Sequence, residues 1–426
     1  MKYVGLVLVA ALAVTAALLP VPDVPVPDPA VPLEEPPVAV CAVEEGSGRT
    51  TEISVLSTVS GPVGLTLFAS GSTAGSIGHE TGSSGSVTIP VVDVAAVGTV
   101  GGLVELPIAS SAAGALVSGA ESMSSESCAA VPHPLTLLAG ATTASEDRFE
   151  LHLMNPYAGV AVVELSVQSE AGIESNQRFE SVIVPPRAST IVDFTELVPG
   201  RETLLIVIET VRGRVISVGR QGVAMESAVW KAVAPAQDWF IPIPAGNGRR
   251  EVVVGTPNNA EVQYQVDFYG PDGLEEGLVS GVLPARGQAT VDVSALSETA
   301  VAMRIISTAP VVPTLWMESG DGLAVTTASP RGANRWLLPG AGNPDGGWST
   351  IVILNTAIEA SEVSIRPLRE ETSMRTLIVE SDSVLELALE KADGYLVESV
   401  GETVVLWSGH RDNSSTAAIG VPMTDG

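Results

Sequence analysis

The chain has 426 residues, of which 45% are apolar, 16% are charged and 4% are aromatic. This length suits three or four domains of about 100–150 residues, and the apolar content is too high for a disordered chain. The formal net charge of −28 opposes contact with the phosphates of nucleic acids or with anionic lipid, so we expect no nucleic acid partner. Two cysteines are too few for a disulfide-rich scaffold or a four-thiolate metal site.

Residues 1–19 predict a membrane signal. Lys2 precedes an uncharged apolar run from Tyr3 to Leu19. As a helix this run is about 25 Å long, a little short of a bilayer core but longer than an ordinary secretory h-region. We expect a signal-anchor over residues 3–19 that leaves the rest of the chain outside the cytoplasm. The alternative is a cleaved signal peptide, with cleavage near Ala16 or Ala17, and secretion of the rest.

Residues 20–40 predict a proline-rich linker that precedes the two cysteines. Prolines fill eight of the positions from 20 to 37, which favours a polyproline II stalk over helix or sheet. Cys41 follows directly, and Cys128 is its only possible partner within the chain. In an oxidising exterior we expect the two to form a disulfide, and its loop entropy adds up to about 4–5 kcal/mol of stability. Two buried free thiols are the alternative.

Beyond Cys41 the pattern predicts an all-β fold. Short runs of Val, Ile, Leu and Thr recur about every 8–12 residues between turn residues, and no window shows a sustained helical stripe. This spacing is typical of Ig-like β-sandwiches. The runs at 160–167 and 190–194 are two of the expected strands.

A longer period divides the same region into tandem copies. Pro185 and Pro284 stand in similar hairpins 99 residues apart, and Trp316 and Trp407 stand 91 residues apart in similar strands. Duplication at this length indicates domains that each hold their own core. We predict four β-sandwich repeats in a string, at residues 41–130, 131–230, 231–330 and 331–426.

The six tryptophans divide into two groups. Four occupy matching places in the repeats or at their joints, and we expect them in cores or seams: Trp239, Trp316, Trp336 and Trp407. Trp230 and Trp348 are the candidates for an exposed contact, since exposed aromatic rings serve as platforms for sugars. Packing is the favoured interpretation for these two as well.

These features together resemble a known family. The signal-anchor, the proline-rich stalk, the paired Cys41 and Cys128, and the repeated Trp-x-x-Pro joints are similar to an actinobacterial family of secreted or membrane-anchored envelope proteins, the domain of unknown function 5719. The resemblance covers essentially the whole chain. It implies a cell-envelope location and a β-rich exterior, and it supplies no catalytic residues.

Motifs of catalysis do not emerge from the sequence. No Gly-x-Ser-x-Gly, phosphate loop or His-Glu-x-x-His string occurs. The four histidines are scattered, and we expect each on the surface or in a loop: His79, His133, His152 and His410. Three Glu pairs are expected to be solvated loop charges, because neighbouring residues on a strand point to opposite faces: Glu44-Glu45, Glu275-Glu276 and Glu370-Glu371. We therefore expect no catalytic residue, no cofactor and no metal.

Two classes of function follow. The first and favoured class is a non-catalytic extracytoplasmic envelope protein that acts as scaffold, spacer or binding module for another envelope protein or a wall polymer. The second is an accessory or degenerate enzyme of envelope-glycan processing, with its site between repeats. Aromatic and carboxylate side chains gathered in one inter-domain cleft would favour the second class. Free edge strands, or an apolar patch without converging polar groups, would favour the first.

Overall fold

The structure is a computed structural model, and Pro36–Gly426 forms one compact unit in it. The residues it describes are 37–44, 48–82, 85–93, 99–120, 122–223, 226–270, 273–296, 298–319, 322–342, 347–368, 374–412 and 414–423. The expected signal-anchor, and the proline-rich linker up to residue 36, lie outside the described residues. The linker was expected to extend to residue 40, but it ends earlier because Val38–Val40 already belong to the first strand.

The strands of the described residues fall into four consecutive sets, and the ladders between named strands stay within a set. The first set contains β1 (Val38–Ala42), β2 (Thr50–Leu56), β3 (Gly61–Ala69), β4 (Ser72–Thr81), β5 (Ser86–Pro90), β6 (Thr99–Glu105), β7 (Ala112–Ser118) and β8 (Met123–Ser127). The second contains β9 (Leu135–Ala141), β10 (Arg148–Asn155), β11 (Ala161–Ser169), β12 (Gly172–Glu174), β13 (Val182–Val184), β14 (Ala188–Asp193), β15 (Leu204–Arg212), β16 (Ile216–Val223) and β17 (Glu226–Lys231).

The third and fourth sets follow the same plan. The third contains β18 (Ala236–Ile243), β19 (Arg249–Gly255), β20 (Val262–Gly270), β21 (Gly273–Leu283), β22 (Gln288–Asp292), β23 (Val301–Ser319) and β24 (Gly322–Thr327). The fourth contains β25 (Ala333–Pro339), β26 (Trp348–Asn355), β27 (Ser361–Pro367), β28 (Arg375–Val379), β29 (Val384–Leu389), β30 (Gly394–Arg411), β31 (Ser414–Ile419) and β32 (Val421–Pro422). The described helices are short: α2 (Phe194–Leu197) and the 3-10 turns η1 (Val91–Asp93), η2 (Gln177–Phe179) and η3 (Ser294–Leu296).

One strand order recurs in the sets. In the first set β1-β6-β3-β4 form one antiparallel sheet and β5-β2-β7-β8 form another, and in the second set β9-β15-β11-β12 and β14-β10-β16-β17 correspond to them. The long strands β23 and β30 pair in both halves of their sets and join each set into one continuous sheet. The described residues thus form six antiparallel sheets, arranged as several β-sandwich units, and the all-β prediction is confirmed.

The strands form because their apolar residues alternate. On β11 the side chains of Ala161, Val163, Leu165 and Val167 are buried, whereas Glu164 between them is exposed. A strand with this period places one face in a core and the other in water. The same reasoning explains the buried faces of the other inner strands.

Each set is closed by its first strand. An isolated bridge or short ladder joins this strand to a residue shortly after β8, β17, β24 or β31 of the same set. The pairs are Val40–Ala129, Leu137–Val233, Phe240–Ser329 and Leu337–Val421. Each sandwich therefore ends next to the place where it began.

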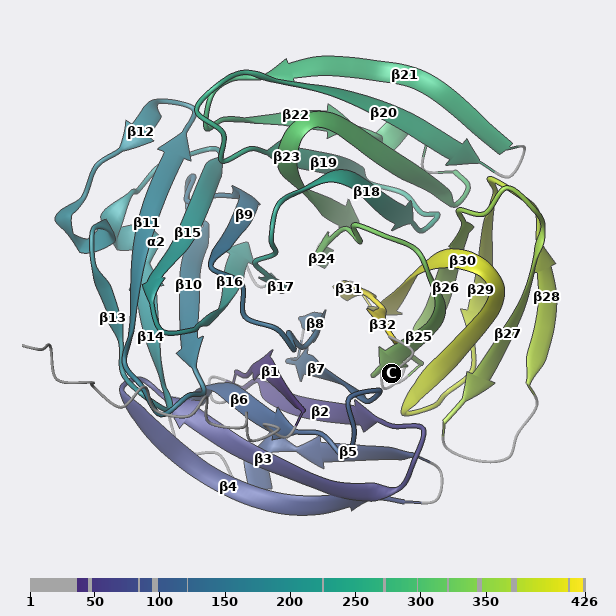
Figure 1. Cartoon of the computed structure of the whole chain (residues 1–426), viewed down its shortest axis with the longest axis horizontal. Coiled ribbons are helices and arrows are strands. Elements are labelled where there is room, and N and C mark those ends of the chain that lie inside the picture. Colours follow the sequence, from purple (N-terminus) through teal and green to yellow (C-terminus); the bar gives the residue numbers. More distant parts are fainter. Residues whose placement is uncertain are drawn as a thin grey trace, which may run out of the picture. The chain divides into compact units, whose positions relative to one another are not determined.

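The sets form a closed circuit of contacts, which differs from the expected string. One strand near the end of each set, β8, β17, β24 or β31, contacts its counterparts in the neighbouring sets, and the four lie at the centre of the unit (Figure 1). Ser125 of β8 and Thr416 of β31 are hydrogen bonded at 2.7 Å between their hydroxyl oxygens. The first set therefore contacts the fourth as well as the second, through small polar side chains that let the strands approach closely.

Candidate functional site

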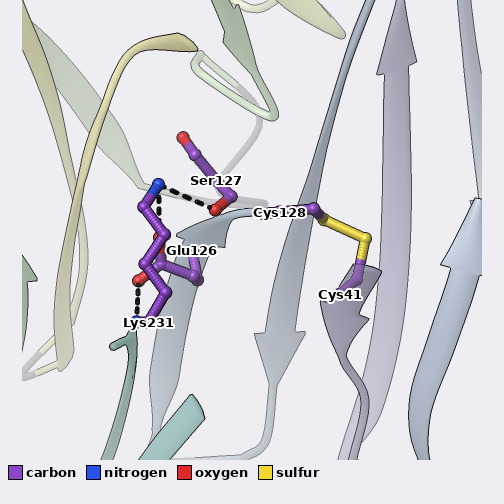
Figure 2. Close-up of a disulfide and its surroundings, with 5 residues drawn as sticks. All are labelled: Cys41, Glu126, Ser127, Cys128 and Lys231. Atoms are coloured by element: carbon purple, nitrogen blue, oxygen red, sulfur yellow. Dashed lines mark hydrogen bonds and ion pairs between the residues drawn. A yellow bond between two sulfur atoms is a disulfide. The ribbon is translucent and has the colours of Figure 1, made fainter. Parts of the chain in front are cut away.

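A disulfide and a buried ion pair join the first strand, the centre and the second set. Cys41 on β1 is bonded to Cys128, which directly follows β8, as the sequence predicts. Glu126 of β8 lies two residues before Cys128 and faces Lys231 at the end of β17, with 3.3 Å between Lys231 Nζ and Glu126 Oε1 (Figure 2). Lys231 Nζ also donates to the carbonyl of Ser127 at 3.1 Å. The disulfide and the polar contacts between β8 and β17 thus involve three consecutive residues, Glu126, Ser127 and Cys128.

Glu126 is buried more deeply than an ordinary ion-pair member. Its side chain is 5% exposed, and burial raises its pKa even though Lys231 opposes that shift. Its second oxygen accepts the backbone N–H of Lys231 at 2.9 Å. The ammonium and the amide of one residue therefore hold the carboxylate at the seam between β8 and β17.

A polar pocket of about 600 Å³ lies between the first and second sets. Arg49 comes from the first set, directly before β2, and the other lining residues come from the second set. They are Ser145, Glu146, Asp147, Arg148, Glu150, Thr195, Arg220, Gly222 and Glu226. We call this cavity the charged pocket.

Local structure places each wall of the charged pocket. A turn in which Asp147 N–H donates to the carbonyl of Ala144 at 2.9 Å brings Glu146 and Asp147 to the start of β10. Thr195 belongs to α2, whose amino end is capped by the carboxylate of Asp193. Gly222 stands opposite Arg148 in the β10–β16 ladder, and its missing side chain leaves the floor open.

A network of ion pairs forms one wall of the charged pocket. Glu44 of the first set binds Arg49 at 3.0 Å and also binds Arg220 of β16. Arg220 lies 3.4 Å from Glu150 of β10, and His152 Nε2 lies 3.1 Å from the same Glu150 oxygen. Two guanidinium groups are thereby occupied, and the network ties the two sets together.

Two of the four carboxyl groups of the second set that line the pocket, Asp147 and Glu150, have pKa values shifted in opposite directions. The hydrogen bond from His152 lowers the pKa of Glu150, against the effect of burial, and Arg220 adds to the lowering. Burial raises the pKa of Asp147, whose hydrogen-bond partner is the hydroxyl of Thr142 at 3.3 Å. Environments that separate two carboxyl pKa values in one cavity are a feature of functional sites as well as of structural ion pairs.

The structure separates the two tryptophans that were candidates for an exposed contact. Trp230 is fully buried, with its ring 5.8 Å from that of Trp316 in the third set, so exposed contact at Trp230 is ruled out. The reason is that β17, although the edge strand of its own sheet, is covered by β8 and β24 of the neighbouring sets. Trp348 is 56% exposed and stacks on His410, with 4.1 Å between the ring centres.

The remaining tryptophans are buried as expected. Trp239 and Trp336 make the same two hydrogen bonds: each ring N–H donates to the carbonyl three residues before it and to a carbonyl of the neighbouring long strand. Trp316 and Trp407 are also buried. The joints therefore anchor the first strand of the third and fourth sets within their own sandwiches.

Two expectations about polar residues are wrong. Glu44 is not a solvated loop charge, because its side chain is 13% exposed and is held by two guanidinium groups. His152 is not on the surface, because it is buried on β10 next to Glu150. The sequence carries no signal for either residue. Alternation along β10 places His152 on the same face as Glu150, opposite Phe149 and Leu151, and the partner of Glu44, Arg220, is 176 residues away. Of the other pairs, Glu275-Glu276 is exposed, and Glu45 and Glu370-Glu371 lie outside the described residues.

The described part of the chain contains neither a cluster of metal ligands nor a membrane-spanning helix. No group of three or more His, Cys, Asp or Glu side chains is placed to hold a metal ion there. Among those same residues, no helix has the length and apolar character needed to cross a membrane.

A sequence comparison settles the family. The model of a family of unknown function, DUF5719, matches residues 101–390 of this chain. The chain belongs to DUF5719. The match spans the end of the first set, the second and third sets, and most of the fourth. It therefore includes the disulfide cysteine Cys128 and all lining residues of the charged pocket except Arg49.

Comparisons with curated proteins and with solved structures add little. No curated protein matches this DUF5719 chain. A tetra-tandem repeat in the extending region of a large adhesion protein is 12% identical over 92% of this chain and 100% of its own, with a TM-score of 0.12. The α-L-rhamnosidase of Streptomyces avermitilis complexed with L-rhamnose is 9% identical over 87% of this chain and 54% of its own, with a TM-score of 0.13. An α-2-macroglobulin mutant from Salmonella is 11% identical over 90% of this chain and 29% of its own, with a TM-score of 0.11. At these scores the likenesses support no argument about this chain.

Proposed function

We propose that this protein is a non-catalytic scaffold and binding module of the cell envelope, held outside the cytoplasm by residues 3–19. The proposal keeps the actinobacterial envelope origin that the sequence resemblance implies. It also assigns the four strand sets to four copies of one ancestral unit, at residues 41–130, 131–230, 231–330 and 331–426. The partner is another envelope protein or a wall polymer.

The disulfide is the observation that carries this proposal. Cys41 is the first residue after the expected linker, and its bond fixes the later part of β1 to the residue that directly follows the central strand β8. Disulfides persist in oxidising compartments, which supports a location outside the cytoplasm. A pull on the linker would act on the centre of the compact unit through a covalent bond, as a tethered scaffold requires. The compact circuit of sets favours a platform over an extended spacer.

The test uses the full-length chain with a carboxyl-terminal tag in its own host. We expect the protein in the membrane fraction, with its tag accessible to external protease, and with residues 1–19 retained by mass spectrometry. Mild cross-linking should then recover one stoichiometric envelope component. A soluble protein within the cytoplasm, with Cys41 and Cys128 reduced, would contradict the proposal. A secreted form cleaved near Ala16 or Ala17 would replace the anchor with the alternative signal.

The charged pocket supports a second candidate, an accessory enzyme of envelope-glycan processing. Asp147 and Glu150 line one cavity between two sets, and their pKa values are shifted apart, as in acid–base pairs of glycosidases. The lining has arginines where a sugar site usually has aromatic rings. Release of reducing ends from purified wall glycan, lost in both Asp147→Asn and Glu150→Gln, would establish the enzyme. The scaffold function predicts no release by the unaltered protein.

A further inference from the structure

The charged pocket has the size and the shape of a site for a small ligand. Its volume of about 600 Å³ lies within the range of roughly 300–1,000 Å³ that is usual for such sites. Two different sets form its walls, and a glycine rather than a side chain forms part of its floor. A Cβ added at Gly222 would meet its nearest neighbours at 3.8–4.0 Å, so the floor is open rather than tightly packed.

Some of the charged groups that line the pocket are held in ion pairs, and others have no ion-pair partner among the described residues. Arg49 and Arg220 are bound by Glu44 and Glu150, as described above. Asp147 has a hydroxyl as its hydrogen-bond partner, and burial, with the nearby charge of Glu202, raises its pKa. Arg148 is exposed, and within the described residues the structure gives its guanidinium no carboxylate at ion-pair distance. Asp147 and Arg148 therefore line the cavity as neighbours at the start of β10, with the exposed carboxylate of Glu146 before them and the buried Glu226 elsewhere in the lining.

We propose that the charged pocket binds a short zwitterionic peptide, whose ammonium contacts Asp147 and whose carboxylate contacts Arg148. An arginine fork suits a carboxylate because it can donate two parallel hydrogen bonds, and a partly buried carboxylate suits a primary ammonium. A ligand with a single charge would leave either Asp147 or Arg148 without a counter-charge. The peptide is either free or part of a wall polymer. This inference deepens the binding role proposed above and rests on it.

The probe is trialanine, titrated calorimetrically into the purified full-length protein. We expect saturable binding, and about tenfold weaker binding for N-acetyl-trialanine and for trialanine amide, each of which lacks one charge. Asp147→Asn should remove the difference between trialanine and its N-acetyl form. Arg148→Gln should remove the difference between trialanine and its amide. Equal binding of all three peptides by the unaltered protein, or no saturable binding of trialanine, would overturn the inference.

A variant that fills the floor provides the matched control. Gly222→Val should abolish trialanine binding, because its side chain enters the cavity without a close contact to move. Gly78→Val places the same side chain on β4, where a Cβ meets nothing within 4 Å, and should bind like the unaltered protein. Both variants should keep the unaltered circular dichroism spectrum. Undiminished binding by Gly222→Val would place the peptide elsewhere and contradict the inference.

Two further experiments show whether the peptide is free or part of the wall polymer, and distinguish failure of this inference from failure of the scaffold proposal. If a soluble fragment of the wall polymer that carries its peptide competes with trialanine, the ligand is the peptide of the polymer. If only peptides that are not attached to the polymer compete, the ligand is a free peptide. Failure of trialanine to bind would leave the location and cross-linking tests of the scaffold function unaffected. A cytoplasmic location would instead contradict the scaffold function while leaving the peptide titration valid.

Discussion

At the scale of single residues, buried charge is placed where two sets of strands meet. Glu126 and Lys231 cross the seam between β8 and β17, and Glu44 and Arg220 cross the seam beside the charged pocket. A buried charge is costly to desolvate, so each of these groups depends on its partner. Such pairs fix which surfaces of the sets meet rather than adding much to stability.

Lys231→Met should destabilise the protein more than a surface substitution does. Removal of the ammonium leaves Glu126 buried without its counter-charge, a loss of about 3–5 kcal/mol. Urea unfolding followed by tryptophan fluorescence measures the change. The double variant Glu126→Gln with Lys231→Met should recover most of the loss, because no charge is then buried alone. A single variant as stable as the unaltered protein would show that water reaches Glu126.

Glu150→Gln should change the pH dependence of stability in acid. The folded protein lowers the pKa of Glu150, so the ionised carboxylate stabilises the fold above its ordinary pKa of about 4.5, and this contribution is lost as the pH falls through the lowered value. The variant should therefore be less stable than the unaltered protein at pH 7, and the difference should vanish at low pH. Urea midpoints between pH 7 and pH 3 test this. Glu276→Gln, at an exposed position of β21, should leave the profile unchanged.

At the scale of elements, the first strand is fixed three times. β1 pairs with β6 along its whole length, bridges to Ala129, and is bonded through Cys41 to Cys128. Strands at the beginning of a chain fray readily unless they are tied down. The tie matters most here, because the expected linker enters the fold at β1.

Reduction of the disulfide should loosen β1 before the rest of the unit. The cysteines are 87 residues apart, and the loop entropy corresponds to at most about 4–5 kcal/mol. We expect Cys41→Ala with Cys128→Ala to lower the midpoint of thermal unfolding and to expose residues near β1 to limited proteolysis. A reductant should have the same effect on the unaltered protein and no effect on the double variant. An unchanged midpoint would mean that the ladder with β6 is sufficient.

At the scale of the whole molecule, the second, third and fourth sets share one core, the first set has a core cluster of its own, and all four meet at the centre. One cluster of buried apolar side chains extends from Leu137 to Ile419 and so includes residues of the second, third and fourth sets. A smaller cluster joins Leu56 and Ala112 of the first set to Leu337 and Leu396 of the fourth. Contacts of this kind make the sets depend on one another, unlike domains in a string.

Heating should therefore unfold the described unit in one main transition. Scanning calorimetry of the full-length protein measures this directly. Ser125→Arg would insert a long charged side chain between β8 and β31 at the hydrogen bond to Thr416, and it should lower the transition temperature of the whole unit. Four separate transitions, or a change confined to a part of the heat absorption, would contradict the shared core and support independent domains.

Much of the secondary structure follows from local patterns. The run at 160–167 corresponds to β11, because alternation of apolar and polar residues needs only its immediate neighbours to be recognised. The run at 190–194 was expected as strand to its end, but Phe194 begins α2 because the carboxylate of Asp193 caps the helix. The pairing of Cys41 and Cys128 was also predictable, since the chain offers no other cysteine.

The all-β class, the recurring strand pattern and the disulfide could be predicted from the amino-acid order, because periodicity and cysteine number are properties of neighbouring residues or of composition. Only the tertiary structure decided that β8, β17, β24 and β31 meet, that Trp230 is buried and that Glu44 reaches Arg220. The central strands carry serines, threonines and alanines, which look like solvent-exposed positions in a sequence. Their small side chains become buried because neighbouring sets close around them, and no local pattern encodes that closure.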